Sequence, residues 1–298
     1  MTACVIALPG ADACADRLAA RLHLRRCRLD SRRFPDGERY LRVIDEVQDR
    51  DVVVVAQLRD PDPQLPGLLF LADTLRELGA ARIGLLAPYL PYMRQDTRFQ
   101  PGEAVTSRSL ARWMASRFDW LATVDPHLHR IPALDELYRI PTAVVPSAAA
   151  IAMWVQGHVS HPHIVGPDSG SEQWAAEVAD FARCGHTVLT KHRHGDRDVA
   201  FERADLSGLH GHTPVLVDDI ISSGHTMASA VRQLRAAGIA PPVCIGVHAV
   251  FTDGAEALLQ RAGAACVVTC NTLPHASNAI DVSEALAEAV RVLRHDEA

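Results

Sequence analysis

The chain has 298 residues, with 30 lysine and arginine residues against 36 aspartate and glutamate residues and a formal net charge of −6 at pH 7. Hydrophobic residues make up 48% of the chain and charged residues 22%, a composition that is typical of a globular protein and excludes a disordered one. The negative charge, without a block of like charges, argues against nucleic acid and anionic membranes as partners.

Short runs of branched apolar residues alternate with helical patterns along the first half of the chain. This pattern predicts strands at residues 4–8, 51–57, 82–87 and 120–125, and helices at residues 11–22, 65–78 and 107–118. Strands that alternate with helices in this way are typical of a parallel sheet with helices packed on its faces.

The second half of the chain repeats this pattern. It predicts strands at residues 163–166, 187–190, 214–218, 243–250 and 265–269, and helices at residues 171–184, 226–237, 255–262 and 282–293. Two prolines among small residues indicate a boundary between residues 140 and 146. We therefore expect an α/β protein of two similar domains, residues 1–143 and 144–298, each a mainly parallel sheet flanked by helices.

The cysteines and the start of the chain bear on location. The seven cysteines are an odd number without a Cys-x-x-Cys pair, so we expect reduced, mostly buried thiols in a cytoplasmic protein. No basic segment precedes the first apolar run, which argues against a signal peptide. Prolines and polar residues interrupt the longest uncharged stretch, residues 140–167, so we do not expect it to span a membrane.

The most informative segment runs from Val215 to Thr226. An apolar strand ends there in Asp218 and Asp219, and a short turn of serine and glycine then opens a helix. Backbone N–H groups in such a turn, with the positive end of the helix dipole behind them, suit a phosphate monoester. The two carboxylates suit the hydroxyls of a sugar beside that phosphate. An ordinary strand-to-helix turn with a serine cap is the structural alternative.

A single lysine, Lys191, stands among the 30 basic residues, and all the others are arginine. It lies two residues before Arg193, after a predicted strand and ahead of the polar segment 194–198, which contains a glycine. A compact ammonium and a planar guanidinium together suit a transferring phosphoryl group, whose nonbridging oxygens gain charge. The alternative is a leftover surface residue.

The segment at residues 218–226 resembles the loop that binds phosphoribosyl pyrophosphate (PRPP) in type I phosphoribosyltransferases and in ribose-phosphate diphosphokinases. Five further segments resemble motifs of the diphosphokinases and stand in that family's order. They are Phe34-Pro35-Asp36-Gly37-Glu38, Pro91-Tyr92-Met93-Arg94-Gln95-Asp96, Asp125-Pro126-His127, Pro167-Asp168-Ser169-Gly170 and Lys191-His192-Arg193. The chain is thus similar to this family, and most of all to its archaeal-type members.

The resemblance implies two tandem phosphoribosyltransferase-like domains. It also implies transfer of the β,γ-diphosphoryl group of ATP to the C1 hydroxyl of ribose 5-phosphate, giving PRPP and AMP, with Lys191 and Arg193 as catalytic residues. Magnesium (Mg²⁺) would lie at His127 and Asp168. ATP would bind to Phe34, Asp36, Gly37, Glu38, Arg94, Gln95, Asp96 and His127. Ribose 5-phosphate would bind to Arg193, Asp218, Asp219, Ser222, Ser223, Gly224, His225 and Thr226. Members of the family are homo-oligomers based on dimers.

Two residues of the phosphate loop depart from the family's commonest pattern. Ser222 stands where an aspartate is usual, and His225 where a small residue is usual. The His225 ring could donate a hydrogen bond to the phosphate or crowd the pocket, and the sequence leaves both open. Two other functions also stay open. One is a non-catalytic subunit that regulates an active partner, and the other is a phosphoribosyltransferase, which would share the loop but would not need residues 34–38 and 94–96.

Overall fold

The computed structural model describes residues 2–128, 130–189, 192–194, 198–200 and 206–295. The chain forms two compact units. Unit 1 contains Met1–Val145 together with Ser283–Ala298, and unit 2 contains Pro146–Val282. Each unit has its own sheet and its own core.

Unit 1 is built on a parallel six-stranded sheet in the order β2-β1-β5-β6-β7-β8. Its strands are β1 (Ala3–Ala7), β2 (Arg25–Cys27), β5 (Asp51–Val55), β6 (Arg82–Leu86), β7 (Trp120–Val124) and β8 (Thr142–Val145). Its helices are α1 (Asp12–Leu22), α2 (Leu65–Glu77), α3 (Thr106–Ala115), α4 (Leu134–Tyr138) and α9 (Ser283–Arg294). An antiparallel hairpin of β3 (Leu29–Arg33) and β4 (Arg39–Val43) follows β2.

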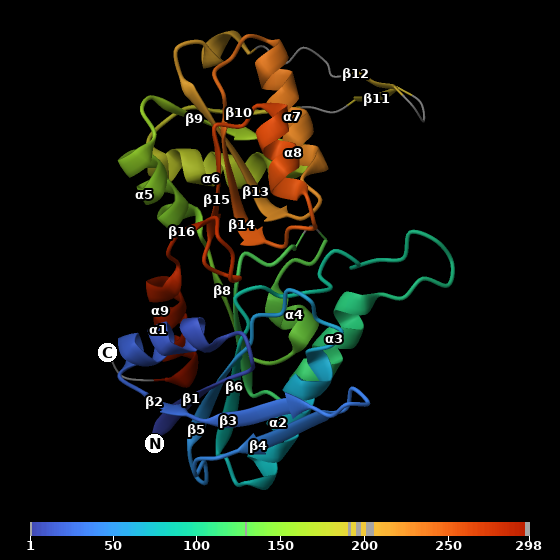
Figure 1. The fold of residues 1–298 in the computed structure, drawn as a ribbon, viewed down its shortest axis with the longest axis vertical. Coiled ribbons are helices and arrows are strands. Elements are labelled where there is room, and N and C mark those ends of the chain that lie inside the picture. The colour runs from blue at the N-terminus through green and yellow to red at the C-terminus, as the bar shows by residue number, and fades with distance from the viewer. Residues whose placement is uncertain (1, 129, 190–191, 195–197, 201–205, 296–298) are drawn as a thin grey trace. The chain divides into compact units, whose positions relative to one another are not determined.

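Strand β5 shows how the sequence produces this layered arrangement. Its four consecutive valines, at positions 52–55, are fully buried, as expected for a strand that is covered on both faces. Val52 and Val54 belong to the core cluster that includes side chains of α2, α3 and α4. The opposite face of the sheet packs against α1 and α9, which lie side by side (Figure 1).

Unit 2 is built on a second parallel six-stranded sheet, in the order β10-β9-β13-β14-β15-β16. Its strands are β9 (Pro162–Gly166), β10 (His186–Val188), β13 (Thr213–Ile221), β14 (Val243–Ala249), β15 (Cys266–Cys270) and β16 (Asn278–Ile280). Its helices are α5 (Ala148–His158), α6 (Glu172–Ala182), α7 (His225–Ala236) and α8 (Ala255–Ala262), with short 3-10 turns η1 (Ser169–Ser171) and η2 (Ser207–Leu209). A second antiparallel hairpin pairs β11 (His192–His194) with β12 (Asp198–Ala200).

The two units repeat one topology. In each sheet the second strand along the chain lies at an edge, the first strand lies beside it, and the later strands follow in chain order. Each unit also inserts its antiparallel hairpin at the same point, after the edge strand. The predicted fold of two tandem, mainly parallel α/β sheets is therefore confirmed.

Several elements differ from the sequence predictions. Strand β13 continues through Asp218 and Asp219 to Ile221, because Asp218 still pairs with Gly246 and Ile220 with His248 of β14. Helix α5 was not predicted, because the prolines just before it were interpreted as a boundary. The edge strands β2, β8 and β16 have only three or four residues each, too few to form the long apolar runs that identify central strands.

The last helix, α9, belongs to unit 1 by its contacts. It packs against α1, β7 and β8, and its Arg294 forms a buried ion pair with Asp51 of β5, with Nε and Oδ2 3.0 Å apart. The division at residues 143 and 144 assigned residues 283–294 to the second domain because they follow it along the chain. The packing of the apolar face of α9 on the sheet of unit 1 decides otherwise.

All seven cysteines lie among the described residues, and none is in a disulfide. Five of them are buried, as predicted for reduced thiols of the core. Among the described helices, none combines the length and the apolar character that a membrane crossing requires.

Candidate functional site

The first predicted nucleotide-binding segment forms the tip of the β3–β4 hairpin. The N–H of Phe34 donates to the carbonyl of Glu38 at 2.8 Å, and the N–H of Gly37 donates to the carbonyl of Phe34 at 2.9 Å. Gly37 has a φ of 94°, which glycine adopts without strain. The Oδ1 of Asp36 accepts from the N–H of Glu38 at 3.2 Å. The turn thus carries an exposed aromatic ring, Phe34, followed by two exposed carboxylates, Asp36 and Glu38.

Arg32 orients that ring. Its guanidinium lies 5.0 Å from the ring centre of Phe34 and 4.6 Å from that of Tyr40, within the range of cation–π attraction. The two rings meet edge to face, with 6.2 Å between their centres. Phe34 is 39% exposed, so part of its side chain is accessible from solvent. The sequence interpretation missed Arg32, although its position two residues before Phe34 places it on the same hairpin.

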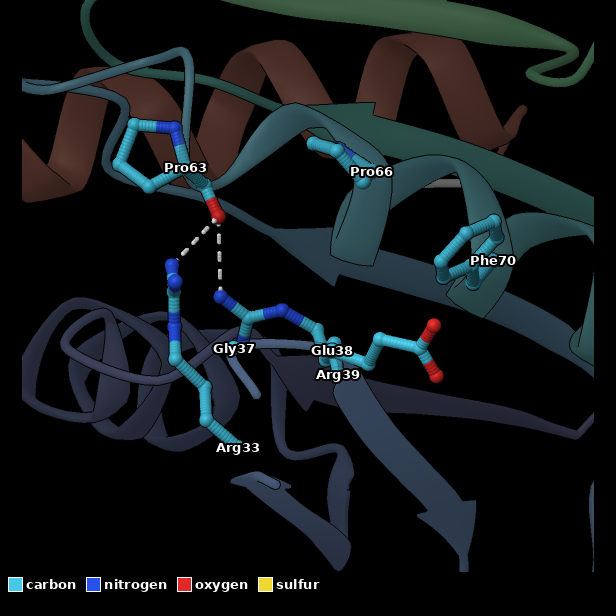
Figure 2. Close-up of a pocket in the computed structure, with 7 residues that line it drawn as sticks. All are labelled: Arg33, Gly37, Glu38, Arg39, Pro63, Pro66 and Phe70. Atoms are coloured by element: carbon cyan, nitrogen blue, oxygen red, sulfur yellow. Dashed lines mark hydrogen bonds between the residues drawn. The ribbon is translucent and has the colours of Figure 1, made fainter. Parts of the chain in front are cut away.

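A hollow of about 460 Å³ lies between the hairpin and the start of α2 (Figure 2). Figure 2 shows Arg33 and Arg39 converging on the carbonyl oxygen of Pro63, which accepts from them at 3.2 and 3.0 Å. Burial and the neighbouring charge of Arg33 lower the pKa of Arg39. Gly37 and Glu38 belong to the lining of this hollow, so part of the predicted nucleotide segment faces a concave, positively charged surface.

The Arg94-Gln95-Asp96 segment follows the carboxyl end of β6. The side-chain oxygen of Gln95 accepts from the hydroxyl of Thr106 at 3.2 Å, which ties the segment to the start of α3. Asp96 is buried, and its Oδ1 accepts from Arg130 at 2.9 Å. Arg94 is exposed. The three predicted nucleotide-binding residues therefore differ in exposure. Arg94 faces solvent and Gln95 is partly buried, while the buried Asp96 holds the segment through its hydrogen bond with Arg130.

His127 follows the carboxyl end of β7, the strand next to β6 in the sheet. It is partly exposed, and the chain reaches it through Asp125, whose φ of 30° marks a sharp turn. Ligands of open α/β sheets bind beyond the carboxyl ends of the strands. Arg94 and His127 lie after two such neighbouring ends, and both belong to unit 1.

In unit 2, Asp168 follows β9 and caps the 3-10 turn η1. Its Oδ1 accepts from the N–H of Gly170 at 3.1 Å, and the Ser171 hydroxyl donates to the Asp168 carbonyl at 2.6 Å. A side chain at position 166 would not fit, because its Cβ would lie 2.6 Å from the Ser171 hydroxyl oxygen. Ser171 was missed as a structural partner, although its spacing from Asp168 is that of a capping pair.

Asp218 and Asp219 lie near the end of β13, the strand next to β9. Burial, the charge of Asp219 and the charge of Asp168 raise the pKa of Asp218 well above its usual range. The N–H of Asp219 donates to Oδ1 of Asp218 at 3.1 Å, which opposes that rise. The charges of Asp168 and Asp219 thus act on Asp218 at the carboxyl ends of two neighbouring strands.

The predicted phosphate turn connects β13 to α7. Gly224 is the residue before the helix and has a φ of 73°. It is buried against α8, since a Cβ at this position would lie 3.4 Å from the carbonyl oxygen of Ala255. The helix begins at His225, so the first N–H groups of α7 lack acceptors within the helix and point towards the turn. Ser223 and His225 are exposed, while Ser222 and Thr226 are partly buried.

Lys191 lies outside the described residues. Arg193 belongs to β11, where its backbone pairs with Val199 of β12. The hairpin of β11 and β12 occupies the same topological position in unit 2 as the β3–β4 hairpin does in unit 1. The hairpin that carries Phe34–Glu38 and the hairpin that carries Arg193 are therefore equivalent insertions in the two units.

The structure groups the predicted residues by unit. The nucleotide-binding set lies in unit 1, and Asp168, Asp218, Asp219 and the phosphate turn lie in unit 2. Among the described residues, no three histidine, cysteine, aspartate or glutamate side chains are arranged to hold a metal ion by themselves. The sequence interpretation also missed Arg130, since no signal in the sequence connects it to Asp96.

Comparison with known families gives matches over both units. A profile for the N-terminal domain of ribose phosphate pyrophosphokinase matches residues 3–117, and a profile for the phosphoribosyl transferase domain matches residues 134–285.

Individual relatives extend the match to nearly the whole chain. A ribose-phosphate pyrophosphokinase of Methanobrevibacter smithii is 32% identical over 93% of this chain and 96% of its own. A second, from Methanopyrus kandleri, is 34% identical over 93% of this chain and 94% of its own. A third, from Methanosarcina acetivorans, is 33% identical over 97% and 99%. The crystal structure of phosphoribosylpyrophosphate synthetase from Mycobacterium smegmatis has the same fold, with a TM-score of 0.88, 24% identity and full coverage of both chains.

Proposed function

Because the chain belongs to the ribose-phosphate pyrophosphokinase family, we propose that the residues described above carry out PRPP synthesis from ATP and ribose 5-phosphate. The protein is an enzyme of that family, a transferase of nucleotide biosynthesis. The observation that carries the residue assignment is the end of β13, where two carboxylates precede a turn of free N–H groups at the start of α7.

Ribose 5-phosphate binds at this end of β13. Its phosphate lies on the turn from Ser222 to Thr226, where backbone N–H groups and the helix dipole attract an anion. The ribose hydroxyls donate to Asp218 and Asp219. The raised pKa of Asp218 supports this role, because hydroxyl donors and a nearby cation would relieve the repulsion among the carboxylates.

ATP binds to residues of unit 1. The exposed ring of Phe34, held by Arg32, offers a stacking surface for adenine, and Asp36 and Glu38 offer acceptors for its amino group or for ribose. Arg94 and His127, beyond the ends of β6 and β7, contact the phosphates. Gln95 is positioned by Thr106 to bind a polar edge of the nucleotide, and Asp96 holds the segment through Arg130.

In the reaction, the C1 hydroxyl oxygen of ribose 5-phosphate attacks the β-phosphorus of ATP. The bond from that phosphorus to the oxygen bridging the α-phosphorus breaks, AMP leaves, and the hydroxyl proton passes to water. Lys191 and Arg193 stabilise the charge that develops on the nonbridging oxygens. Positioning and electrostatics supply most of the rate, as in other phosphoryl transfers.

Magnesium suits the donors that are present. Asp168 supplies a carboxylate oxygen, the ligand type that Mg²⁺ prefers, and its charge already acts on Asp218. In unit 1, His127 would contact a Mg²⁺ ion weakly or through water. When bound, the ion neutralises charge on the transferring phosphates.

A direct test follows AMP formation from ATP with Mg²⁺, with and without ribose 5-phosphate. We expect AMP to appear only when the sugar phosphate is present, together with an equal amount of PRPP. AMP release that ignores the sugar, or no release at all, would contradict the proposal. A phosphoribosyltransferase would instead consume PRPP when a base is added.

We further propose that the enzyme is a homo-oligomer that associates with a second copy through α2 and α3. Phe70 and Trp113 are 52% and 53% exposed and border an apolar hollow of about 500 Å³ in unit 1. The same surface thus carries both projecting rings and a cavity, which suits a twofold contact. Light scattering should show a smaller species for Trp113→Glu and an unchanged mass for Phe181→Glu, an exposed aromatic of unit 2.

A cytoplasmic location also remains a prediction.

A further inference from the structure

The phosphate turn of unit 2 is supported from outside by the segment that links β14 to α8. The N–H of Thr252 donates to the carbonyl of Ser222 at 3.2 Å. Gly224 packs against Ala255, whose carbonyl oxygen would lie in van der Waals contact, at 3.4 Å, with a Cβ at that position. Residues 250–255 therefore fix the place of the turn from the side of the neighbouring strand.

A buried histidine precedes this supporting segment by two residues. His248, near the end of β14, is 1% exposed and pairs with Ile220 of β13 across the sheet. Its Nδ1 lies 3.0 Å from the hydroxyl oxygen of Thr272, which belongs to the loop after β15 and is fully buried. That hydroxyl in turn donates to the carbonyl of Val247 at 2.9 Å.

The hydrogen bonds of Thr272 determine which nitrogen of His248 carries a proton. The hydroxyl has one hydrogen, and the carbonyl of Val247 can only accept. The hydroxyl hydrogen therefore points to Val247, and the short contact with His248 requires Nδ1–H to donate to the Thr272 oxygen. His248 is thus held with its proton on Nδ1.

A second contact joins the same two segments. The rings of Phe251 and His275 have centres 4.6 Å apart, with their planes tilted by 40°. The Nδ1 of His275 lies 2.8 Å from the Ser277 hydroxyl oxygen and 3.2 Å from the Ser277 backbone nitrogen. The loop after β15 thus contacts β14 and the β14–α8 segment at two places, through Thr272 and through His275.

We propose that His248 and Thr272 are positioning residues for the ribose 5-phosphate turn. Their hydrogen bond fixes the position of the β14–α8 segment. In that position Thr252 donates to Ser222 and Ala255 packs against Gly224. Neither residue contacts the sugar phosphate. The inference rests on the proposed function, since it concerns the affinity of that turn for ribose 5-phosphate.

Paired variants separate this role from simple core packing. Asn places its amide N–H near the position of Nδ1, whereas Gln places it near Nε2. Likewise, Thr272→Ser keeps the hydroxyl and Thr272→Val removes it while preserving volume. We expect His248→Gln and Thr272→Val to raise the KM for ribose 5-phosphate about tenfold, as for the loss of one buried hydrogen bond. The KM for ATP and kcat should stay within about twofold.

The matched controls should behave differently. His248→Asn and Thr272→Ser keep the donor and the acceptor, so we expect their KM for ribose 5-phosphate within about threefold of the wild type. Thermal unfolding of all four variants measures the loss of packing separately. If KM followed the loss of stability instead of the presence of the donor, the positioning role would be wrong.

A nitrogen-15 NMR spectrum of the wild-type histidines tests the bond without any activity measurement. We expect the His248 ring to show a protonated Nδ1. The reverse pattern at His248 would overturn the inference. Failure of the proposed function would look different, because the wild type itself would then form no AMP in response to ribose 5-phosphate while the NMR result still stood.

Discussion

Asp168 and Asp218 lie at the carboxyl ends of the neighbouring strands β9 and β13, close enough for their carboxylates to repel each other. Burial, the adjacent Asp219 and this repulsion together raise the pKa of Asp218. A carboxylate whose pKa is raised on folding costs stability once it ionises. The site therefore holds a destabilising charge that substrate or cation binding can offset.

Asp218→Asn should stabilise the free protein while impairing catalysis. The pKa of Asp218 is higher in the folded protein than in the unfolded chain. The free energy of unfolding is therefore highest at low pH and falls as pH rises through the folded pKa. Asn removes that loss, so we expect the Tm of the variant to exceed the wild-type Tm by a few degrees near pH 7.5, about the effect of 1 kcal/mol. The difference should shrink towards pH 4.

Calorimetry across pH checks this prediction, with Asp180→Asn, an exposed aspartate of α6, as the control. The control should leave Tm unchanged at every pH. A lower Tm for Asp218→Asn at neutral pH would show that the carboxylate is stabilised by its surroundings, contrary to the electrostatic argument.

Lys191→Ala should lower kcat by roughly 10²- to 10³-fold, as for the removal of one donor to the transition state. Lys191→Arg should not restore full activity, because a planar guanidinium differs in shape from an ammonium. Circular dichroism should show an unchanged fold. Arg232→Ala, at an exposed position of α7, is the control with near-normal kcat. A near-normal rate for Lys191→Ala would mean that the single lysine has no role in catalysis.

His225→Ala should raise the KM for ribose 5-phosphate about three- to tenfold, as for the loss of one hydrogen bond to a charged group. His225 is the first residue of α7 and is exposed, so its ring has room to turn towards a phosphate on the adjacent N–H groups. Alanine keeps the helix start and removes the ring. A fall in KM would show instead that the ring crowds the pocket.

Arg294→Met should destabilise unit 1 by roughly 3–5 kcal/mol, because it leaves the buried Asp51 carboxylate without its partner. Adding Asp51→Asn should recover part of the loss, since the uncompensated charge is then gone. Glu284→Gln, which alters a largely exposed partner of Arg21, should change stability by less than about 1 kcal/mol. Denaturant unfolding of the single and double variants gives the interaction free energy between Arg294 and Asp51. If the changes in unfolding free energy of the two single variants simply added up in the double variant, the ion pair would have no energetic effect.

The central strands could be predicted from the sequence because both of their faces are buried. The run of four valines in β5 is not interrupted by a polar residue that could face water, so it directly predicts a strand covered on both faces. Strand β2 shows the opposite case. It contains two arginines and one buried cysteine, and its pairing with β1 at the sheet edge leaves no apolar run to find.

The motifs of the candidate site are visible in the sequence, and their role in binding stays a prediction; the residues that contact them across the fold are not visible there. Asp218, Asp219 and the turn after them stand together along the chain, so their spacing reveals them. Arg130, His248 and Thr272 act across long sequence separations. Their partners become neighbours only through strand pairing and helix packing, which a single sequence does not display.

The return of α9 to unit 1 has a consequence during synthesis on the ribosome. The sheet of unit 1 leaves the ribosome early, but the helix that covers part of one face follows residues 146–282. At about 5–20 residues per second, that interval lasts on the order of 10 s. A nascent chain therefore carries an uncovered apolar face throughout this time, and chains that stop before Ser283 should aggregate or recruit chaperones.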